Sequence, residues 1–316
     1  MGRPIVALLH LYCRPMPIWQ NTSLARQPRL EPDANIAELR QRYATSFQRF
    51  SPVPADAKFQ ATQLGPVKGE WVTVDRSSTN RTILYFHGGG FIAGSPQTHR
   101  SLVARLCDHG FARAYSVAYR LAPEYLFPAG LRDGVDAYRA LLQTDVDPAS
   151  IVLAGDDAGG GLVFAAVLAI RNGGMPLPAA CIAMSPWVDL TLSGGSILGN
   201  AKTDAVLSWD LLFLTTRNYL KKQSPADPYA SPIYAGFRDF PPVMVHAGSL
   251  EILKDDASRI GDKAAEANVP VSVEIYDGMQ HLFQANADLQ EAKVSLQRMG
   301  QFIRQRTGRV TASAAQ

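Results

Sequence analysis

The residues of this 316-residue chain best suited to chemistry centre on Gly155–Gly160, where a short apolar run gives way to an Ala/Gly-rich stretch. Their spacing matches the pattern G-x-S-x-G, in which a strained strand-to-helix turn exposes the side chain of the central residue. The central residue here is Asp157, where the pattern has serine. Taken alone, the match would also suit a tight turn without chemistry. The question that it raises is what an aspartate does at a position built for a nucleophile.

A glycine-rich loop, His87–Phe91, directly follows the continuous apolar run Thr82–Phe86, about 70 residues before Asp157. Three consecutive glycines let backbone N–H groups face a ligand without obstruction by Cβ atoms. Such amides, together with the N–H of Ala158, could stabilise an oxyanion. A merely flexible glycine loop is the alternative, and the buried strand before it disfavours that alternative.

An acid and a base follow in the order that a catalytic triad of this kind requires. Glu251 lies shortly past the apolar run Val243–His246, and His281 lies on a glycine-containing loop just past another run. Asp255 and Asp256 compete with Glu251, but acids there suit the first turn of the next helix. The sequence therefore predicts that Glu251 orients His281 beside the Asp157 position.

Apolar runs alternate with amphipathic stretches along the chain, which indicates an α/β fold with a mostly parallel sheet covered on both faces. Beside the runs already named, we expect strands at 71–74, 112–119, 151–154, 180–185 and 271–276, and helices at 33–50, 97–109, 129–143, 157–171, 209–220, 255–268 and 288–306. A less legible helix-like piece precedes residue 33. The carboxyl ends of parallel strands share one edge of a sheet, so the candidate residues should meet there.

Composition excludes several function classes. A net charge of +3 without a dense basic cluster gives no support for nucleic-acid binding. Cys13, Cys107 and Cys181 are scattered and lack CxxC spacing, which predicts reduced thiols in the cytoplasm and no metal site. The apolar stretch Ile5–Leu11 is too short to span a bilayer, so we expect no stable membrane insertion.

Together these segments resemble the bacterial carboxylesterases of the hormone-sensitive-lipase family (bacterial family IV) of α/β-hydrolases. The resemblance rests on six segments spread over roughly residues 70–300: His87–Phe91, Tyr119–Glu124 with Phe127–Ala129, Gly155–Gly160, Ser185–Trp187, the surroundings of Glu251, and Asp277–His281. It implies hydrolysis of a small ester with short-to-medium acyl groups through a serine acyl-enzyme, without a cofactor. It also implies oxyanion donors at Gly88, Gly89 and Ala158. By analogy with the family, a homodimer is possible.

The same resemblance divides the chain into a helical cap and a catalytic domain. We expect cap helices in residues 1–50, the catalytic domain in 51–308 with a cap insertion at about 190–235, and a disordered tail at 309–316. Four aromatic residues, Trp187, Trp209, Phe213 and Tyr219, are candidates for an acyl pocket. Plain packing is the alternative for each of them.

Asp157 is the departure from the family that matters most. A carboxylate that attacks an ester would form a mixed anhydride, which is more activated than the ester, so this step is uphill. We expect Asp157 to be ionised, to accept a hydrogen bond from His281 and to compete for the oxyanion hole. Three interpretations stay open: a substituted and nearly inert serine esterase, a ligand-binding protein on a dead hydrolase scaffold, or an aspartate nucleophile for SN2 chemistry, as in haloalkane dehalogenases and epoxide hydrolases.

Overall fold

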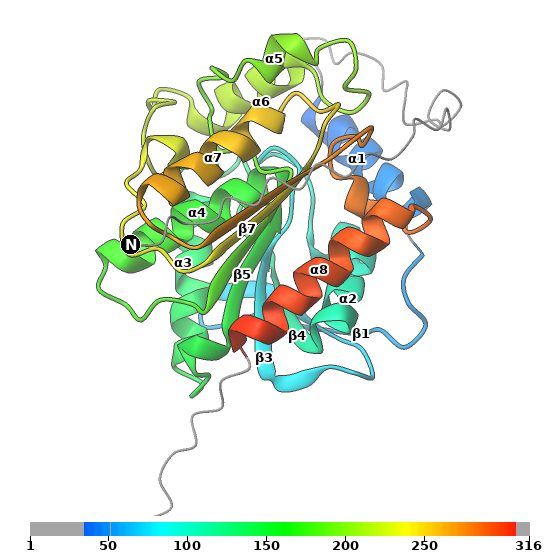
Figure 1. Ribbon diagram of the computed structural model, residues 1–316, viewed down its shortest axis with the longest axis vertical. Coiled ribbons are helices and arrows are strands. Elements are labelled where there is room, and N and C mark those ends of the chain that lie inside the picture. Colours follow the sequence, from blue (N-terminus) through cyan, green and yellow to red (C-terminus); the bar gives the residue numbers. More distant parts are fainter. Residues whose placement is uncertain (1–34, 51, 308–316) are drawn as a thin grey trace, which may run out of the picture.

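The computed structural model describes residues 35–50 and 52–307, and their strands form one sheet in the order β1-β2-β4-β3-β5-β6-β7-β8 (Figure 1). The strands are β1 (Lys58–Leu64), β2 (Val67–Thr73), β3 (Ser78–Phe86), β4 (Ala112–Val117), β5 (Ile151–Asp156), β6 (Ala180–Met184), β7 (Val243–Gly248) and β8 (Val271–Tyr276). From β4 to β8 all neighbours are parallel, whereas β2 runs antiparallel to both β1 and β4. The α/β prediction is confirmed.

Helices cover both faces of this sheet because successive strand residues point to opposite sides. The larger helices are α1 (Ile36–Phe50), α2 (Pro96–Gly110), α3 (Ala129–Leu142), α4 (Asp157–Asn172), α6 (Trp209–Leu220), α7 (Lys254–Glu266) and α8 (Gln290–Thr307). On β3, Leu84 and Phe86 belong to the core under α3, α4 and α7. Ile83 and Tyr85 belong to the core under α2 and α8, which lie side by side in Figure 1.

The expected insertion contains the short helix α5 (Ser196–Gly199), α6 and a 3₁₀ turn at Pro232–Tyr234. Figure 1 shows α1, α5 and α6 gathered at one end of the sheet. The helix-like piece before residue 33, the apolar stretch Ile5–Leu11 and the tail after residue 307 lie outside the described residues. No helix among those that the structure describes is long and apolar enough to cross a membrane.

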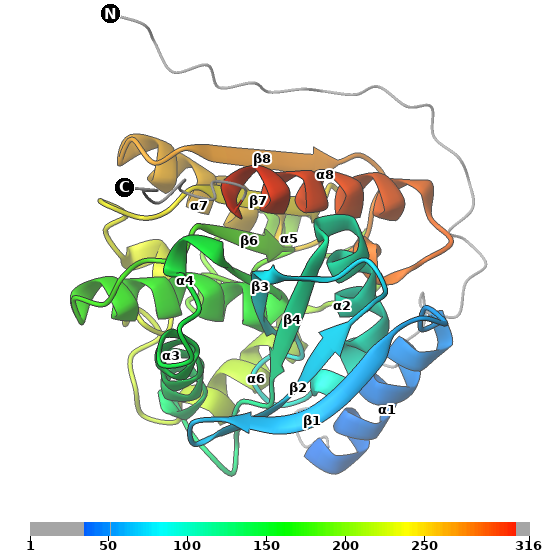
Figure 2. The same cartoon turned by 90° about the horizontal axis from the view of Figure 1, so that it is seen from below.

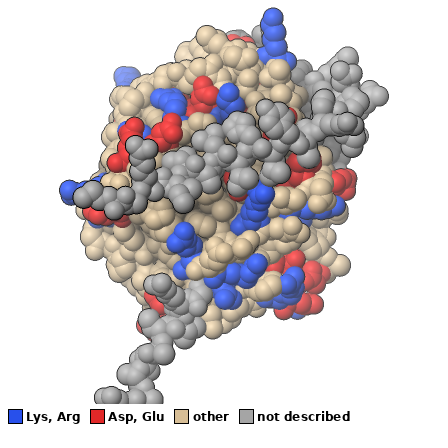
Figure 3. Space-filling model, in the orientation of Figure 1, with Lys and Arg blue, Asp and Glu red and all other residues tan. Residues whose placement is uncertain are grey.

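One strand escapes the sequence prediction. β1 pairs with β2 at the edge of the sheet that Figure 2 shows, through a turn at Gly65, which has a positive φ of 55°. Most of its residues are exposed or half-buried, so no apolar run marks it. Over the face shown in Figure 3, cationic and anionic side chains are interspersed among the described residues, as the small net charge suggests.

Candidate active site

The turn between β5 and α4 carries Asp157 at the carboxyl edge of the sheet. Asp157 begins α4 with a φ of +49°, a left-handed conformation that is costly for a residue other than glycine. The two flanking glycines let this turn pack closely: a Cβ on Gly155 would lie 2.5 Å from the Gly159 carbonyl oxygen, and one on Gly159 would lie 2.0 Å from that of Phe86. The sequence pattern thus forms the strained elbow that it predicts.

The Asp157 carboxylate lies against the glycine-rich loop that follows β3. Its Oδ2 atom accepts hydrogen bonds from the amide nitrogens of Gly89 and Gly90, at 3.0 and 2.9 Å. Its Oδ1 atom is buried and has no hydrogen-bond partner among the described residues. The side chain is therefore anchored through one oxygen and leaves the other unsatisfied.

The backbone amides that face the centre of the site differ from those that the sequence predicts. The amide of Gly88, expected to point at the reacting centre, donates to Asp156 Oδ1 at 3.1 Å. The Gly88 N–H therefore donates to a buried side chain rather than toward the centre of the site. The amides of Gly89 and Gly90 donate to the Asp157 carboxylate instead. Ala158 is buried at the start of α4, and the role of its amide stays a prediction.

Glu251 and His281 meet at the ends of β7 and β8, as their positions in the sequence predict. Glu251 Oε2 lies 2.7 Å from His281 Nδ1, and both side chains are buried. The rivals lie elsewhere: Asp255 Oδ2 accepts from the Ser196 amide, and Asp256 Oδ2 accepts from the amides of Val188 and Asp189. Glu251 is the acid that contacts the imidazole.

The second imidazole nitrogen points toward the elbow. His281 Nε2 lies 3.9 Å from Asp157 Oδ1, which is close enough for an ion pair but too long for the hydrogen bond expected from the sequence. Although burial opposes protonation, the carboxylates of Glu251, Asp157 and Asp204 raise the pKa of His281 to about 9. The surroundings of His281 therefore favour the protonated form of its ring.

Many known proteins are similar to this chain in sequence or in fold. Residues 83–285 match the family model of the alpha/beta hydrolase fold. An acetyl-hydrolase of Streptomyces hygroscopicus is 38% identical over 78% of this chain and 82% of its own length, and an esterase of Acinetobacter venetianus is 36% identical over 80% and 84%.

Solved structures agree with these relatives. An esterase of the bacterial hormone-sensitive lipase family superposes with a TM-score of 0.85 at 37% identity, over 90% of this chain and 95% of its own. EstE7, a homologue from a metagenome library, superposes with a TM-score of 0.83 at 36% identity, over 87% and 94%. The chain belongs to the hormone-sensitive-lipase family of α/β-hydrolases.

Ser185 links Glu251 to the segment that carries His281, a contact that the sequence motif around Ser185 does not specify. Its Oγ donates to Glu251 Oε1 at 3.0 Å and accepts from the amide of Leu282, next to His281, at 3.0 Å. Ser185 and Leu282 both have left-handed backbones, with φ of 44° and 52°. Strained residues thus cluster around the acid–base pair, as they often do at active sites.

A second buried carboxylate, that of Asp156, contacts the glycine loop. Besides the Gly88 amide, Asp156 accepts from the Tyr85 hydroxyl at 2.6 Å and lies 3.2 Å from His99 Nε2. All four residues are buried. The sequence gives no sign of this cluster because Tyr85 and His99 look like ordinary core residues of a strand and a helix.

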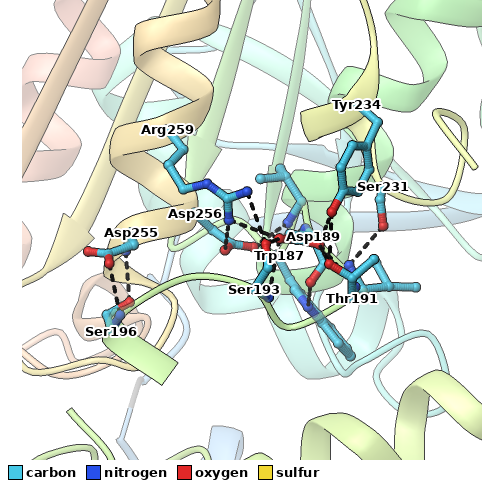
Figure 4. A network of polar contacts seen from close by, with 12 residues as sticks. Trp187, Asp189, Thr191, Ser193, Ser196, Ser231, Tyr234, Asp255, Asp256 and Arg259 are labelled. Atoms are coloured by element: carbon cyan, nitrogen blue, oxygen red, sulfur yellow. Dashed lines mark hydrogen bonds and ion pairs between the residues drawn. The ribbon is translucent and has the colours of Figure 1, made fainter. Parts of the chain in front are cut away.

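A polar network beside the site fixes the segment that follows Trp187 (Figure 4). Arg259 Nη1 lies 2.8 Å from Asp189 Oδ2 and 3.8 Å from Asp256 Oδ1. Burial raises the pKa of Asp256 to about 8, despite the two backbone amides that donate to it. The acids set aside as rivals of Glu251 thus have structural contacts of their own.

The four aromatic pocket candidates divide into two pairs. Trp187 is fully buried and donates through Nε1 to the Asp189 carbonyl, and Tyr219 is buried with its ring stacked on Phe91 at 4.0 Å. Both serve as packing. Trp209 and Phe213 stack on each other at 4.8 Å and are 44% and 42% exposed, so only this pair stays available to a ligand.

Proposed function

We propose that this chain is a carboxylesterase scaffold for short-to-medium acyl esters in which Asp157 suppresses turnover. One observation carries the proposal: the Asp157 Oδ2 atom takes the hydrogen bonds of Gly89 and Gly90. In the serine enzymes of the family, loop amides of this kind stabilise the negative oxygen of the tetrahedral intermediate. A substrate carbonyl would have to displace an anion from both donors.

The chemistry at Asp157 opposes turnover as well. Attack of a carboxylate on an ester forms a mixed anhydride and expels an alkoxide, and this product is less stable than the ester consumed. A serine at the same position would instead pass its proton to His281 while Glu251 holds the imidazole. The surrounding acid–base pair therefore suits a nucleophile that this chain lacks.

The test is hydrolysis of p-nitrophenyl butyrate by the Asp157 chain and by Asp157→Ser. We expect the serine variant to gain about 10⁴–10⁶-fold, the usual cost of losing a nucleophile. Asp157→Ala is the matched control, because it frees the glycine amides without supplying a nucleophile, and it should stay slow. A folded serine variant without activity would overturn the esterase proposal and favour a ligand-binding role.

A second candidate function rests on the unpaired Asp157 Oδ1 atom. It could attack an sp³ carbon and release a halide, leaving an alkyl ester on Asp157. Water deprotonated by His281 would then add to Cγ and release the alcohol, while Gly89 and Gly90 hold the negative charge on Oδ2. The alkyl ester no longer carries the Asp157 charge that helps to raise the pKa of His281, which favours a neutral imidazole in this second step. Halide release by the Asp157 chain, absent from Asp157→Ser, would support it.

A further inference from the structure

The segment between α5 and α6, residues 200–207, is bonded to the loop that carries the acid. Asn200 Nδ2 donates to the carbonyl oxygens of Ser249 and Glu251, at 2.9 and 2.8 Å. Asp204 Oδ2 accepts from the amide of Ile252, the residue after Glu251, at 2.7 Å. We call residues 200–207 the tether. It contacts the backbone on both sides of the Glu251 side chain.

The tether is also bonded to the loop that carries the base. Gln280, which precedes His281, accepts from the amide of Ala205 through Oε1 and donates to the carbonyl of Thr203 through Nε2, both at 2.9 Å. Gln280 is 7% exposed, so these bonds lie largely away from water. One short piece of the cap insertion therefore fixes the residues that adjoin both members of the acid–base pair.

Asp204 joins these contacts to the start of the cap helix. Its Oδ1 atom accepts from the amides of Val206 and Leu207, each at 2.8 Å, just before α6 begins. On its other side α6 reaches the glycine loop, since a Cβ on Gly90 would lie 3.0 Å from Thr215 Cγ2. The Asp204 carboxylate thus connects the segment before α6 to the backbone beside Glu251.

We propose that Asp204 is a positioning residue. Through the tether, it holds the loops of Glu251 and His281 in place relative to the cap helix α6. The proposal deepens the proposed esterase function and rests on it. Ser196, also in the insertion, reaches one of these loops, since its Oγ donates to the carbonyl of Ile252 at 2.6 Å, whereas the tether bonds to the loops of both Glu251 and His281.

Electrostatics adds to this geometry. Charged groups face His281 from three elements: Glu251 after β7, Asp157 at the start of α4, and Asp204 in the tether, and each raises the pKa of the imidazole. Burial in turn raises the pKa of Asp204 itself. Removing the Asp204 charge should therefore lower the pKa of His281, whereas the loss of a contact far from His281 and Glu251 should leave it unchanged.

The experiment uses two readouts. The changes Asp204→Asn, Asn200→Ala and Asp227→Asn are first made in the Asp157 chain, and the His281 ring is titrated by NMR in each variant. The same three changes are added to Asp157→Ser, and kcat and KM are measured with p-nitrophenyl butyrate. Asp227 is the matched control, because it also accepts a backbone amide within the insertion, that of Tyr229, but does not contact the catalytic loops.

We expect Asp204→Asn to lower the pKa of His281 and to cut kcat by about 10–100-fold, as misplacement of a catalytic group does, with KM less affected. Asn200→Ala should also lower kcat, and it tests the tether if Asp204→Asn does not fold. Asp227→Asn should change neither.

An unchanged His281 pKa together with unchanged kcat in Asp204→Asn would overturn the proposal, as would an effect on KM alone. If Asp157→Ser itself is inactive, the esterase proposal fails, and the His281 titration in the Asp157 chain still tests whether Asp204 acts on His281.

Discussion

The Oδ2 atom of Asp157 lies 3.0 Å from the amide nitrogen of Gly89, so the side chain at the elbow and the glycine loop hold each other. A serine side chain is shorter and would leave this amide to a substrate oxygen. The same contact turns Oδ1 toward His281, at 3.9 Å. The Asp157 carboxylate therefore contacts the glycine loop through one oxygen and faces His281 with the other.

Asp157→Asn should lower the pKa of His281 below its present value of about 9. The amide keeps the size of the side chain and an oxygen for Gly89 and Gly90, but removes one of the carboxylates that stabilise the imidazolium. An NMR titration of the His281 ring measures the change. A pKa that stays near 9 would show that Glu251 and Asp204 alone set it.

Glu251→Gln, added to Asp157→Ser, should reduce kcat by about 10⁴-fold. The acid of a triad holds the base in the right tautomer and stabilises its protonated form, and Glu251 is 2.7 Å from His281 Nδ1. Initial rates with p-nitrophenyl butyrate check this. Asp255→Asn in the same background should have little effect, and a larger loss there than in Glu251→Gln would contradict the assignment of the acid.

The sequence predicts the parts of this site that lie close to strand ends. Asp157, Glu251 and His281 each follow an apolar run, and parallel strands bring such positions to one edge. Which glycine amide faces the centre is not readable, because it depends on Asp156 below the loop drawing the Gly88 N–H away.

Contacts between distant segments are equally hidden from the sequence. Asp204 and Ile252 are 48 positions apart, and Ser185 and Leu282 are 97 apart, so no local pattern reports their hydrogen bonds. The strand Lys58–Leu64 was missed for another reason: an edge strand with mostly exposed or half-buried side chains needs no apolar run.

The stability of the Asp157 chain should fall between pH 6.5 and 9 because of His281. The pKa of a histidine is about 6.5 in the unfolded chain and is raised to about 9 here, so folding takes up a proton in this window. The stabilisation, at most about 3 kcal/mol, is fully present below pH 6.5 and is lost as the pH rises through 9. Urea denaturation across this range measures it, and His281→Gln should flatten the curve. Equal slopes in the two proteins would contradict the raised pKa.

Gly159→Ala should destabilise the fold by about 1–3 kcal/mol or more. The new Cβ would lie 2.0 Å from the Phe86 carbonyl oxygen and 2.5 Å from that of His87, and both are backbone atoms that cannot move aside alone. Relief would require α4 to shift away from the glycine loop, which would also lengthen the bonds from Gly89 and Gly90 to Asp157. Gly236→Ala is the control, because nothing lies within 4 Å of its Cβ position, and it should change stability by less than about 0.5 kcal/mol. If urea denaturation gives both variants the same stability, then the close approach of the elbow to β3 is not what requires glycine at position 159.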